Sequence, residues 1–131
     1  VLGWIRDDLS PKIATPVIAF PLLYLMNKEK TGVIMVVPMN GITCEVHTAC
    51  LPELWGKASE FIKECIDWGC DNTRYQKIIT YIPTFNRLAI RITKKAGFEQ
   101  EGRIKESFVK DWKLYDQLIF GMTKKDYLER R

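Results

Sequence analysis

The chain has 131 residues, of which 47% are hydrophobic and 27% charged, and this composition excludes an intrinsically disordered polymer. This length is enough for one domain with a buried core, so we expect a single domain over residues 1–131. Twenty lysines and arginines against sixteen acidic residues leave a net charge of +4 that is spread along the chain. This balance permits an anionic ligand such as a nucleotide, but it does not by itself favour nucleic acid as a partner.

The cysteine pattern predicts free thiols rather than a metal centre. The four cysteines are Cys44, Cys50, Cys65 and Cys70. No pair has the spacing of a zinc knuckle and His47 is the sole histidine of the sequence, so we expect no metal. Buried free thiols indicate a reducing compartment. We see no signal peptide, and the apolar run over 15–26 contains two prolines and is too short to span a bilayer, so we expect a cytoplasmic protein.

The first third of the chain is expected to form a short helix and then several strands. Apolar residues on one side predict the helix over 2–9, which Ser10 and Pro11 would end. A strand over 17–20 and 22–26 would be broken or bent at Pro21. Further strands are predicted over 31–38 and 42–51, with a turn between them at 39–41.

The strand over 42–51 carries two titratable residues on one side. Successive side chains of a strand point to opposite faces, so Glu45 and His47 share a face with Thr43 and Ala49. If this strand is central, these polar groups need either a water-filled cleft or a hydrogen-bonding partner. They therefore indicate a site, although an edge strand with a solvated Glu45 explains the pattern equally well.

A strand, a glycine turn and a helix are predicted to follow one another at this point of the chain. We predict a tight turn at 55–57 and then a helix whose apolar face runs from Ala58 to Gly69, where the helix would end. The first amides of a helix have no partner within the helix, and the helix dipole adds positive charge there. Because Gly56 and Ala58 have little or no side chain, these amides could bind a phosphate, although an ordinary turn is the simpler interpretation.

The rest of the chain predicts a parallel crossover and a long hairpin. The strand over 77–82 is apolar on both faces, as a parallel strand covered by helices would be. A helix over 86–96 follows and ends at Gly97. An antiparallel hairpin over 98–109 and 114–122 comes next, and Thr123 with Asp126 resembles a capping box that opens a terminal helix. The class is therefore α/β, with an α+β mixed sheet.

Several short motifs occur in a characteristic order over about residues 42–131. PELWGKA at 52–58 is similar to a pyrophosphate loop of the form Q/R-x-x-G-x-G/A before a helix. NRLA at 86–89, KAGF at 95–98, EG at 101–102 and YD at 115–116 follow in order. In this order the chain resembles the GNAT superfamily of N-acetyltransferases, in particular the ribosomal-protein-acetylating type and, through EVHT at 45–48, small phage-encoded relatives.

The resemblance implies a GNAT-like acyl-CoA N-acyltransferase fold, in which a V-shaped split opens a central mixed sheet between the strands ending at Leu51 and Ile82. Helices would cover both faces, and acetyl-coenzyme A would lie in the split. The residues implied to bind it through backbone groups are Ala49, Leu51, Gly56, Lys57, Ala58 and Ser59. The Asn86 side chain would also contact it, although Asn86 could instead cap the helix that follows.

The resemblance also implies the reaction. A primary amine on a protein N-terminus, a lysine or a small molecule would attack the thioester directly, and a base would remove its proton. Glu45 is the expected base and His47 the other candidate, although His47 could equally be a core histidine. The expected partner is this amine-bearing acceptor, in the cytoplasm of a bacterial or phage-infected cell, and a second copy of the chain in a homodimer is a further candidate.

Three positions depart from the family pattern and put turnover in more doubt than cofactor binding. Glu53 stands where Gln or Arg is usual, Trp55 where Arg is common, and Thr93 where many members carry the tyrosine that protonates the leaving thiolate. Tyr81 and Tyr115 are candidate substitutes for that tyrosine.

Two other functions remain open beside the N-acetyltransferase that we expect. One is a catalytically degenerate GNAT-like protein that binds coenzyme A or serves as a viral accessory or interaction module. The other is a nucleic-acid binder, whose basic residues a solvated surface explains more simply. Its candidate residues are Lys94, Lys95, Lys124, Lys125, Arg130 and Arg131.

Overall fold

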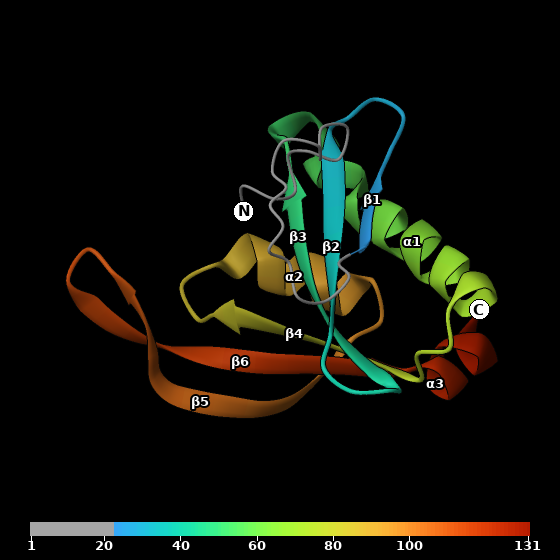
Figure 1. The fold of residues 1–131 in the computed structure, drawn as a ribbon. Helices are drawn as coiled ribbons and strands as arrows, with labels where there is room; N and C mark the ends of the chain where they lie inside the picture. Colours follow the sequence, from blue (N-terminus) through green and yellow to red (C-terminus); the bar gives the residue numbers. More distant parts are fainter. Residues whose placement is uncertain (1–22) are drawn as a thin grey trace, which may run out of the picture.

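The computed structural model describes residues 23–131, which form one six-stranded mixed sheet in the order β1-β2-β3-β4-β6-β5 (Figure 1). The strands are β1 (Leu23–Met26), β2 (Gly32–Pro38), β3 (Thr43–Cys50), β4 (Lys77–Pro83), β5 (Glu99–Lys110) and β6 (Lys113–Thr123). The helices are the 3-10 helix η3 (Pro52–Lys57), α1 (Ala58–Asn72), α2 (Arg87–Lys95) and α3 (Lys124–Arg130). The helix predicted over 2–9, the strand over 17–20 and the bend at Pro21 lie outside the described residues.

The sheet opens between β3 and β4, as predicted. These parallel strands are paired at three positions: Thr43 with Lys77, Cys44 with Ile78, and Glu45 with Ile79. Beyond the third pair β3 continues to Cys50 and β4 to Pro83, and the register describes no further pair between them. Figure 1 shows the two strands diverging from this point. The predicted V-shaped split therefore has its vertex at Glu45 and Ile79.

The chain passes from β3 to α1 differently from the prediction. The expected tight turn at 55–57 is wrong, because Pro52 stands in the first turn of a 3-10 helix that continues to Lys57. The expected end of α1 at Gly69 is also wrong, because the helix continues to Asn72. The N–H and the hydroxyl of Thr73 both donate to the Gly69 carbonyl, at 2.9 and 2.7 Å, so Gly69 lies in a last turn that Thr73 caps.

The described helices pack on one face of the sheet. The core joins α1, α2 and α3 to side chains of β2, β3, β4 and β6 that share a face. These side chains are Ile34, Val36, Cys44, Ile82, Leu118, Phe120 and Met122. In the view of Figure 1, α2 lies behind β2 and β3.

On the opposite face of the sheet, the structure does not bear out the prediction that helices cover both faces. Within residues 23–131 no helix covers it, and the one further helix that we predicted, over 2–9, lies outside this range. None of the helices seen in residues 23–131 has the length and apolar character needed to cross a membrane.

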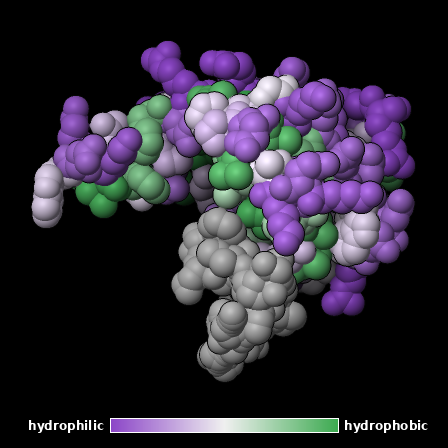
Figure 2. All heavy atoms as spheres, turned by 90° about the horizontal axis from the view of Figure 1, so that it is seen from above, coloured by the Kyte–Doolittle hydropathy of each residue, from purple (hydrophilic) through white to green (hydrophobic). Residues whose placement is uncertain are grey.

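The predicted pair of antiparallel strands is confirmed as the β5–β6 hairpin. The hairpin projects from the body of the molecule as an arm, along which apolar side chains lie among charged ones (Figure 2). Its turn residues Asp111 and Trp112 have φ angles of 51° and 65°, which non-glycine residues adopt uncommonly. The register with β6 shifts between Gln100 and Gly102 and again between Ile104 and Phe108. Such irregularities bend a strand and interrupt its pairing edge.

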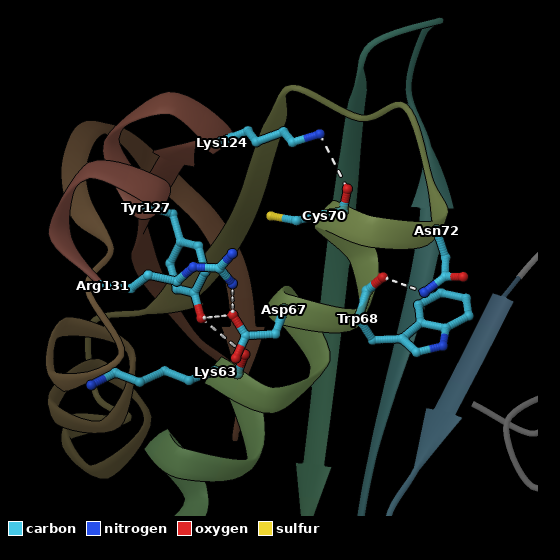
Figure 3. Close-up of polar contacts among 8 residues, drawn as sticks. All are labelled: Lys63, Asp67, Trp68, Cys70, Asn72, Lys124, Tyr127 and Arg131. Atoms are coloured by element: carbon cyan, nitrogen blue, oxygen red, sulfur yellow. Dashed lines mark hydrogen bonds and ion pairs between the residues drawn. The ribbon is translucent and has the colours of Figure 1, made fainter.

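The terminal helix α3 is held against α1 by polar contacts that Figure 3 shows. The Tyr127 hydroxyl donates to Asp67 at 2.7 Å and lies 3.1 Å from the Lys63 carbonyl oxygen. Arg131 also donates to Asp67. The Lys124 ammonium donates to the Cys70 carbonyl at 3.2 Å.

The predicted capping box at the start of α3 is confirmed in part. The Thr123 hydroxyl accepts from the Asp126 N–H at 3.0 Å, which satisfies one of the first amides of the helix.

Candidate functional site

A cavity of about 410 Å³ occupies the split and extends between the sheet and the helices α1 and α2. The helix-facing side chains of β3 form one wall: Cys44, Val46, Thr48 and Cys50. The opposite wall comes from β4, with Ile78, Thr80 and Ile82, and from α2, with Ala89, Ile92 and Thr93. The walls are mostly apolar, so the cavity suits a narrow ligand with few charges along its length.

Main-chain groups of β3 face the split at alternate residues. Just before the strand, the Ile42 carbonyl points towards β4, because it accepts from the N–H groups of Gln76 and of Lys77, the first residue of β4. After its end, the Leu51 N–H points the other way, to Thr31 beside β2. Because the direction of these groups alternates along a strand, even-numbered residues of β3 direct their main chain towards β4.

This alternation corrects one expectation about the cofactor-binding residues. The main-chain groups of Ala49 point to β2, where Ala49 pairs with Val33, so Ala49 cannot offer them to a ligand. Its two neighbours Thr48 and Cys50 direct their main-chain groups into the split instead, and we did not predict these two residues as cofactor-binding. The sequence carries no signal of which alternate residues face β2, because that depends on the register with the neighbouring strand. The Cys50 carbonyl is already occupied, since the Trp55 indole N–H donates to it at 3.3 Å.

The 3-10 helix changes the expected phosphate-binding loop. The Ala58 N–H donates to the Trp55 carbonyl, and Ala58 and Ser59 are only 1% and 4% exposed. Gly56 and Lys57 are exposed, and among the described atoms nothing lies within 4 Å of the place where a Gly56 Cβ would sit. Space for an anion therefore lies beside Gly56 and Lys57. Leu51, at the start of this segment, is also exposed.

Glu53 and Trp55, the two residues of this segment that depart from the family pattern, lie at different places relative to the cavity. Glu53 is exposed and is not among the residues that line the cavity. Trp55 lines the cavity and is 46% exposed. The carboxylate of Glu53 therefore leaves the split open, and Trp55 stands at its mouth.

Glu45 and His47 share a face of β3, as the alternation predicted, and contact each other directly. His47 Nε2 lies 3.0 Å from Glu45 Oε2, and the two side chains are 52% and 22% exposed. Glu45 pairs with Ile79 in the last pair before the strands diverge. The pair therefore lies at the vertex of the split, on the side opposite the core. His47 lines the cavity, whereas Glu45 is not among the lining residues.

Asn86 is the cap of α2. Its side-chain oxygen accepts from the Ala89 N–H at 3.1 Å, so the capping role that we left open is the one the structure shows. Asn86 also lines the cavity, and its side-chain amide nitrogen is the group that remains for a ligand.

The candidate acids for a leaving thiolate lie at different places. Tyr81, on β4 two residues past the vertex, lines the cavity, and so does the buried Thr93. Tyr115 instead packs against Phe85, with 4.8 Å between the ring centroids. The structure thus brings Tyr81, and not Tyr115, to the cavity.

The four cysteines are free, as predicted, and all line the cavity. Burial raises the pKa of Cys44 to about 11, and burial with the nearby Glu64 raises the pKa of Cys65 to about 12. Cys44 is buried and the other three are half-buried. Over residues 23–131, no three His, Cys, Asp or Glu side chains are grouped closely enough to bind a metal ion.

Comparison with known proteins supports the predicted resemblance. No protein-family profile matches the sequence. The SPbeta prophage-derived uncharacterized N-acetyltransferase YokL of Bacillus subtilis is 32% identical over 72 residues, which are 55% of this chain and 41% of that protein. The chain thus spans less than half the length of this curated relative.

Solved structures of spermidine N-acetyltransferase SpeG from Vibrio cholerae share the fold. A chimera of SpeG and hSSAT matches with a TM-score of 0.71 at 21% identity, covering 82% of this chain and 68% of its own. The complex of SpeG with CoA and spermine matches with a TM-score of 0.69 at 22% identity, covering 79% and 64%. The chain therefore shares the fold of these N-acetyltransferase structures, as the resemblance to the GNAT superfamily implied.

Proposed function

We propose that this chain is an acetyl-CoA-dependent N-acetyltransferase that acetylates a primary amine by direct attack on the thioester. The observation that carries the proposal is the abrupt end of the β3–β4 pairing at Glu45 and Ile79, beside a cavity of about 410 Å³. A titratable pair stands at that vertex. The likeness to named acetyltransferases supports the proposal independently.

The pantetheine arm of acetyl-coenzyme A suits the split. It is a narrow chain whose amides can pair with the main-chain groups of Thr48 and with the Cys50 N–H, as a strand would. Its pyrophosphate would lie beside Gly56 and Lys57, where the helix dipole and the Lys57 ammonium favour negative charge. The side-chain nitrogen of Asn86 would contact the arm from the opposite wall. Leu51, Ala58 and Ser59, the other residues of this segment that were implied to bind the cofactor, would hold Gly56 and Lys57 in position.

The residues at the vertex would perform the proton transfers. Glu45 removes the proton from the attacking amine, and His47, 3.0 Å away, orients the carboxylate. The amine nitrogen bonds to the thioester carbon as the carbon–sulfur bond breaks. The thiolate leaves and takes a proton from Tyr81, which lines the same cavity. His47 remains the alternative base.

The class of acceptor is open among a protein N-terminus, a lysine and a small amine. One structural neighbour is a spermidine N-acetyltransferase in complex with CoA and spermine, which supports testing a polyamine. At 22% identity this likeness concerns the fold and does not identify the acceptor. Panels of peptide amines and of small amines are therefore both needed.

A protein that binds coenzyme A without turnover, or that serves as an accessory module, is the second candidate. The Trp55 indole N–H on the Cys50 carbonyl favours it, because this bond must break before the pantetheine arm can use that carbonyl. Nucleic-acid binding has less support. Three of its six candidate cations make internal contacts: Lys124 with Cys70, Arg130 with Glu99, and Arg131 with Asp67.

Single-turnover acetylation with Glu45→Gln and His47→Asn tests the chemistry. We expect Glu45→Gln to lower the rate of acetyl transfer by about 100-fold or more while coenzyme A affinity is kept, since general bases contribute about this much. Glu29→Gln, in the exposed β1–β2 turn, is the matched control and should have no effect. A large loss in His47→Asn alone would make His47 the base, and full activity in both variants would contradict proton transfer at this pair.

A further inference from the structure

Three aromatic rings meet near the turn of the hairpin arm. Phe85 follows β4, and it packs against Phe108 of β5 and Tyr115 of β6, with ring centroids 5.7 and 4.8 Å apart. The ring planes are inclined by 57° and 67°, and we call this cluster of three rings the aromatic cup. The Lys110 ammonium lies over the Phe85 ring at 4.6 Å from its centroid. One ring of the cup, that of Phe85, therefore already contacts an ammonium group.

The aromatic cup and the proposed base belong to the same face of the sheet. Glu45 pairs with Ile79, which pairs with Gly121 on β6, so these residues share a face. Counting along β6 by alternate residues, this face also carries Tyr115, which pairs with Phe108. The same face thus runs from the vertex of the split to the cup.

The distance along this face is set by the strands. Gly121 and Tyr115 are six residues apart on β6, which at about 3.3 Å per residue gives roughly 20 Å between the vertex and the cup. A small triamine with seven carbons between its terminal nitrogens extends only to roughly 11 Å at ordinary bond lengths. An extended peptide of about four residues, together with a lysine side chain, spans the whole distance.

We propose that the aromatic cup binds the ammonium group of a lysine in an extended peptide acceptor, about four residues from the amine that reacts at Glu45. The inference rests on the proposed function and names its acceptor class, a basic peptide. Lys110 occupies the cup while the acceptor is absent and is displaced by the incoming lysine. The cup is thus a specificity site remote from the reacting atoms.

The chain offers a matched pair of lysines for a test. Lys110 and Lys113 pair with each other across the hairpin turn and carry the same charge. Lys110 lies over Phe85, and the contacts of the described residues place no ring under Lys113. Lys110→Met and Lys113→Met therefore change the net charge equally and differ only at the cup.

The experiment measures equilibrium binding of synthetic peptides by fluorescence anisotropy, with coenzyme A added and no acetyl donor. Each probe has a free N-terminus, an alanine-serine backbone and one lysine at a single position along the peptide, with norleucine as the uncharged control. A parallel titration with coenzyme A reports cofactor binding. Failure of the proposed cofactor site would remove that signal, whereas failure of the cup would leave it intact.

We expect lysine near the fifth position to lower the Kd most, by about three- to five-fold relative to norleucine, as a partly exposed cation–π contact allows. Lys110→Met should strengthen this preference further, and Lys113→Met should leave it unchanged. Phe85→Leu, and independently Phe108→Leu, should abolish the preference while coenzyme A still binds.

Three results would overturn the inference. They are a lysine preference that does not depend on position, equal shifts in Lys110→Met and Lys113→Met, and a preference that survives in both phenylalanine variants. Spermidine that binds more tightly than the peptide with lysine at the fifth position, with the same dependence on Phe85, would identify a small polyamine as the occupant and would likewise overturn it.

Discussion

Cys44 and Cys65 lie in the wall of the cavity, and burial raises their pKa values to about 11 and about 12. Both thiols are therefore protonated at neutral pH, and the thiolate is the reactive form. We expect iodoacetamide at about pH 8, close to the pKa of a free cysteine, to label them far more slowly in the native protein than in denaturant, as mass spectrometry of each peptide would report. Equal native and denatured rates at Cys65 would contradict the packing of α1 on β3.

The residues of the site were predictable only in part. Alternation along one strand was enough to place Glu45 and His47 on a common face. It was not enough to decide that Thr48 and Cys50, rather than Ala49, direct their main-chain groups into the split, because that choice depends on the partner strand. The contact from Trp55 to Cys50 likewise joins a side chain to a carbonyl whose direction no local pattern reveals.

One carboxylate joins the two strands of the hairpin arm in the half that lies nearer the turn. Asp116 accepts from Arg103 Nε at 2.6 Å and from the Glu106 N–H at 2.8 Å, and its own main-chain carbonyl accepts from the Thr84 N–H at 3.0 Å. The Glu106 N–H and then the Arg103 side chain hold the pKa of Asp116 below its usual range. Because the folded pKa is the lower one, this contribution is present at neutral pH and is lost as the pH falls through it.

We therefore expect acid to loosen the arm below about pH 4, where an ordinary aspartate also protonates. Hydrogen exchange at amides of β5 should rise there, and Asp116→Asn should show the higher exchange already at neutral pH. Asp111→Asn, at the exposed turn, is the control. Exchange in Asp116→Asn that matches the parent chain at neutral pH would show that the carboxylate does not order the arm.

Tyr127 ties α3 to α1. Its ring is buried, and its hydroxyl donates to Asp67 at 2.7 Å. Tyr127→Phe keeps the packing and removes the hydrogen bond to a charged group, so we expect a loss of about 1–2 kcal/mol in the free energy of unfolding. Urea denaturation measures this loss. Tyr75→Phe is the control, since no hydrogen bond of its hydroxyl is found among the described residues, and an equal loss in both would contradict a specific role for the bond.

At the level of elements, the presence of each helix and strand was easier to predict than the residues at which it begins and ends. Apolar spacing correctly identified the helices now seen as α1 and α2, and β-branched runs identified β2 and β4. The end of α1 was misplaced because glycine suggests a stop, whereas the helix continues past Gly69 to Asn72 and is capped by Thr73. The start of α1 at Ala58 was predicted correctly, but the segment before it was not, because Pro52 begins a 3-10 helix that already includes the glycine at position 56.

At the scale of the whole molecule, the order of the motifs was enough to predict the fold and the split in the sheet. The aromatic cup was not predictable, because it joins residues from three segments through a register that shifts between Ile104 and Phe108. The projection of the hairpin arm depends on the same irregular pairing (Figure 1). Short local patterns were enough to predict the topology, whereas the details of the site depend on the register between strands that are distant in the sequence.

The most direct test of the proposed cofactor site is isothermal titration with acetyl-coenzyme A of the intact chain, Gly56→Asp and Gly41→Asp. Both glycines have open space around the Cβ position and lack a positive φ, so either aspartate should be tolerated by the fold. We predict that the intact chain and Gly41→Asp bind alike and that Gly56→Asp binds at least about tenfold more weakly, because its carboxylate repels the pyrophosphate. Absence of binding by the intact chain, or equal affinity in all three proteins, would contradict a cofactor site in the split.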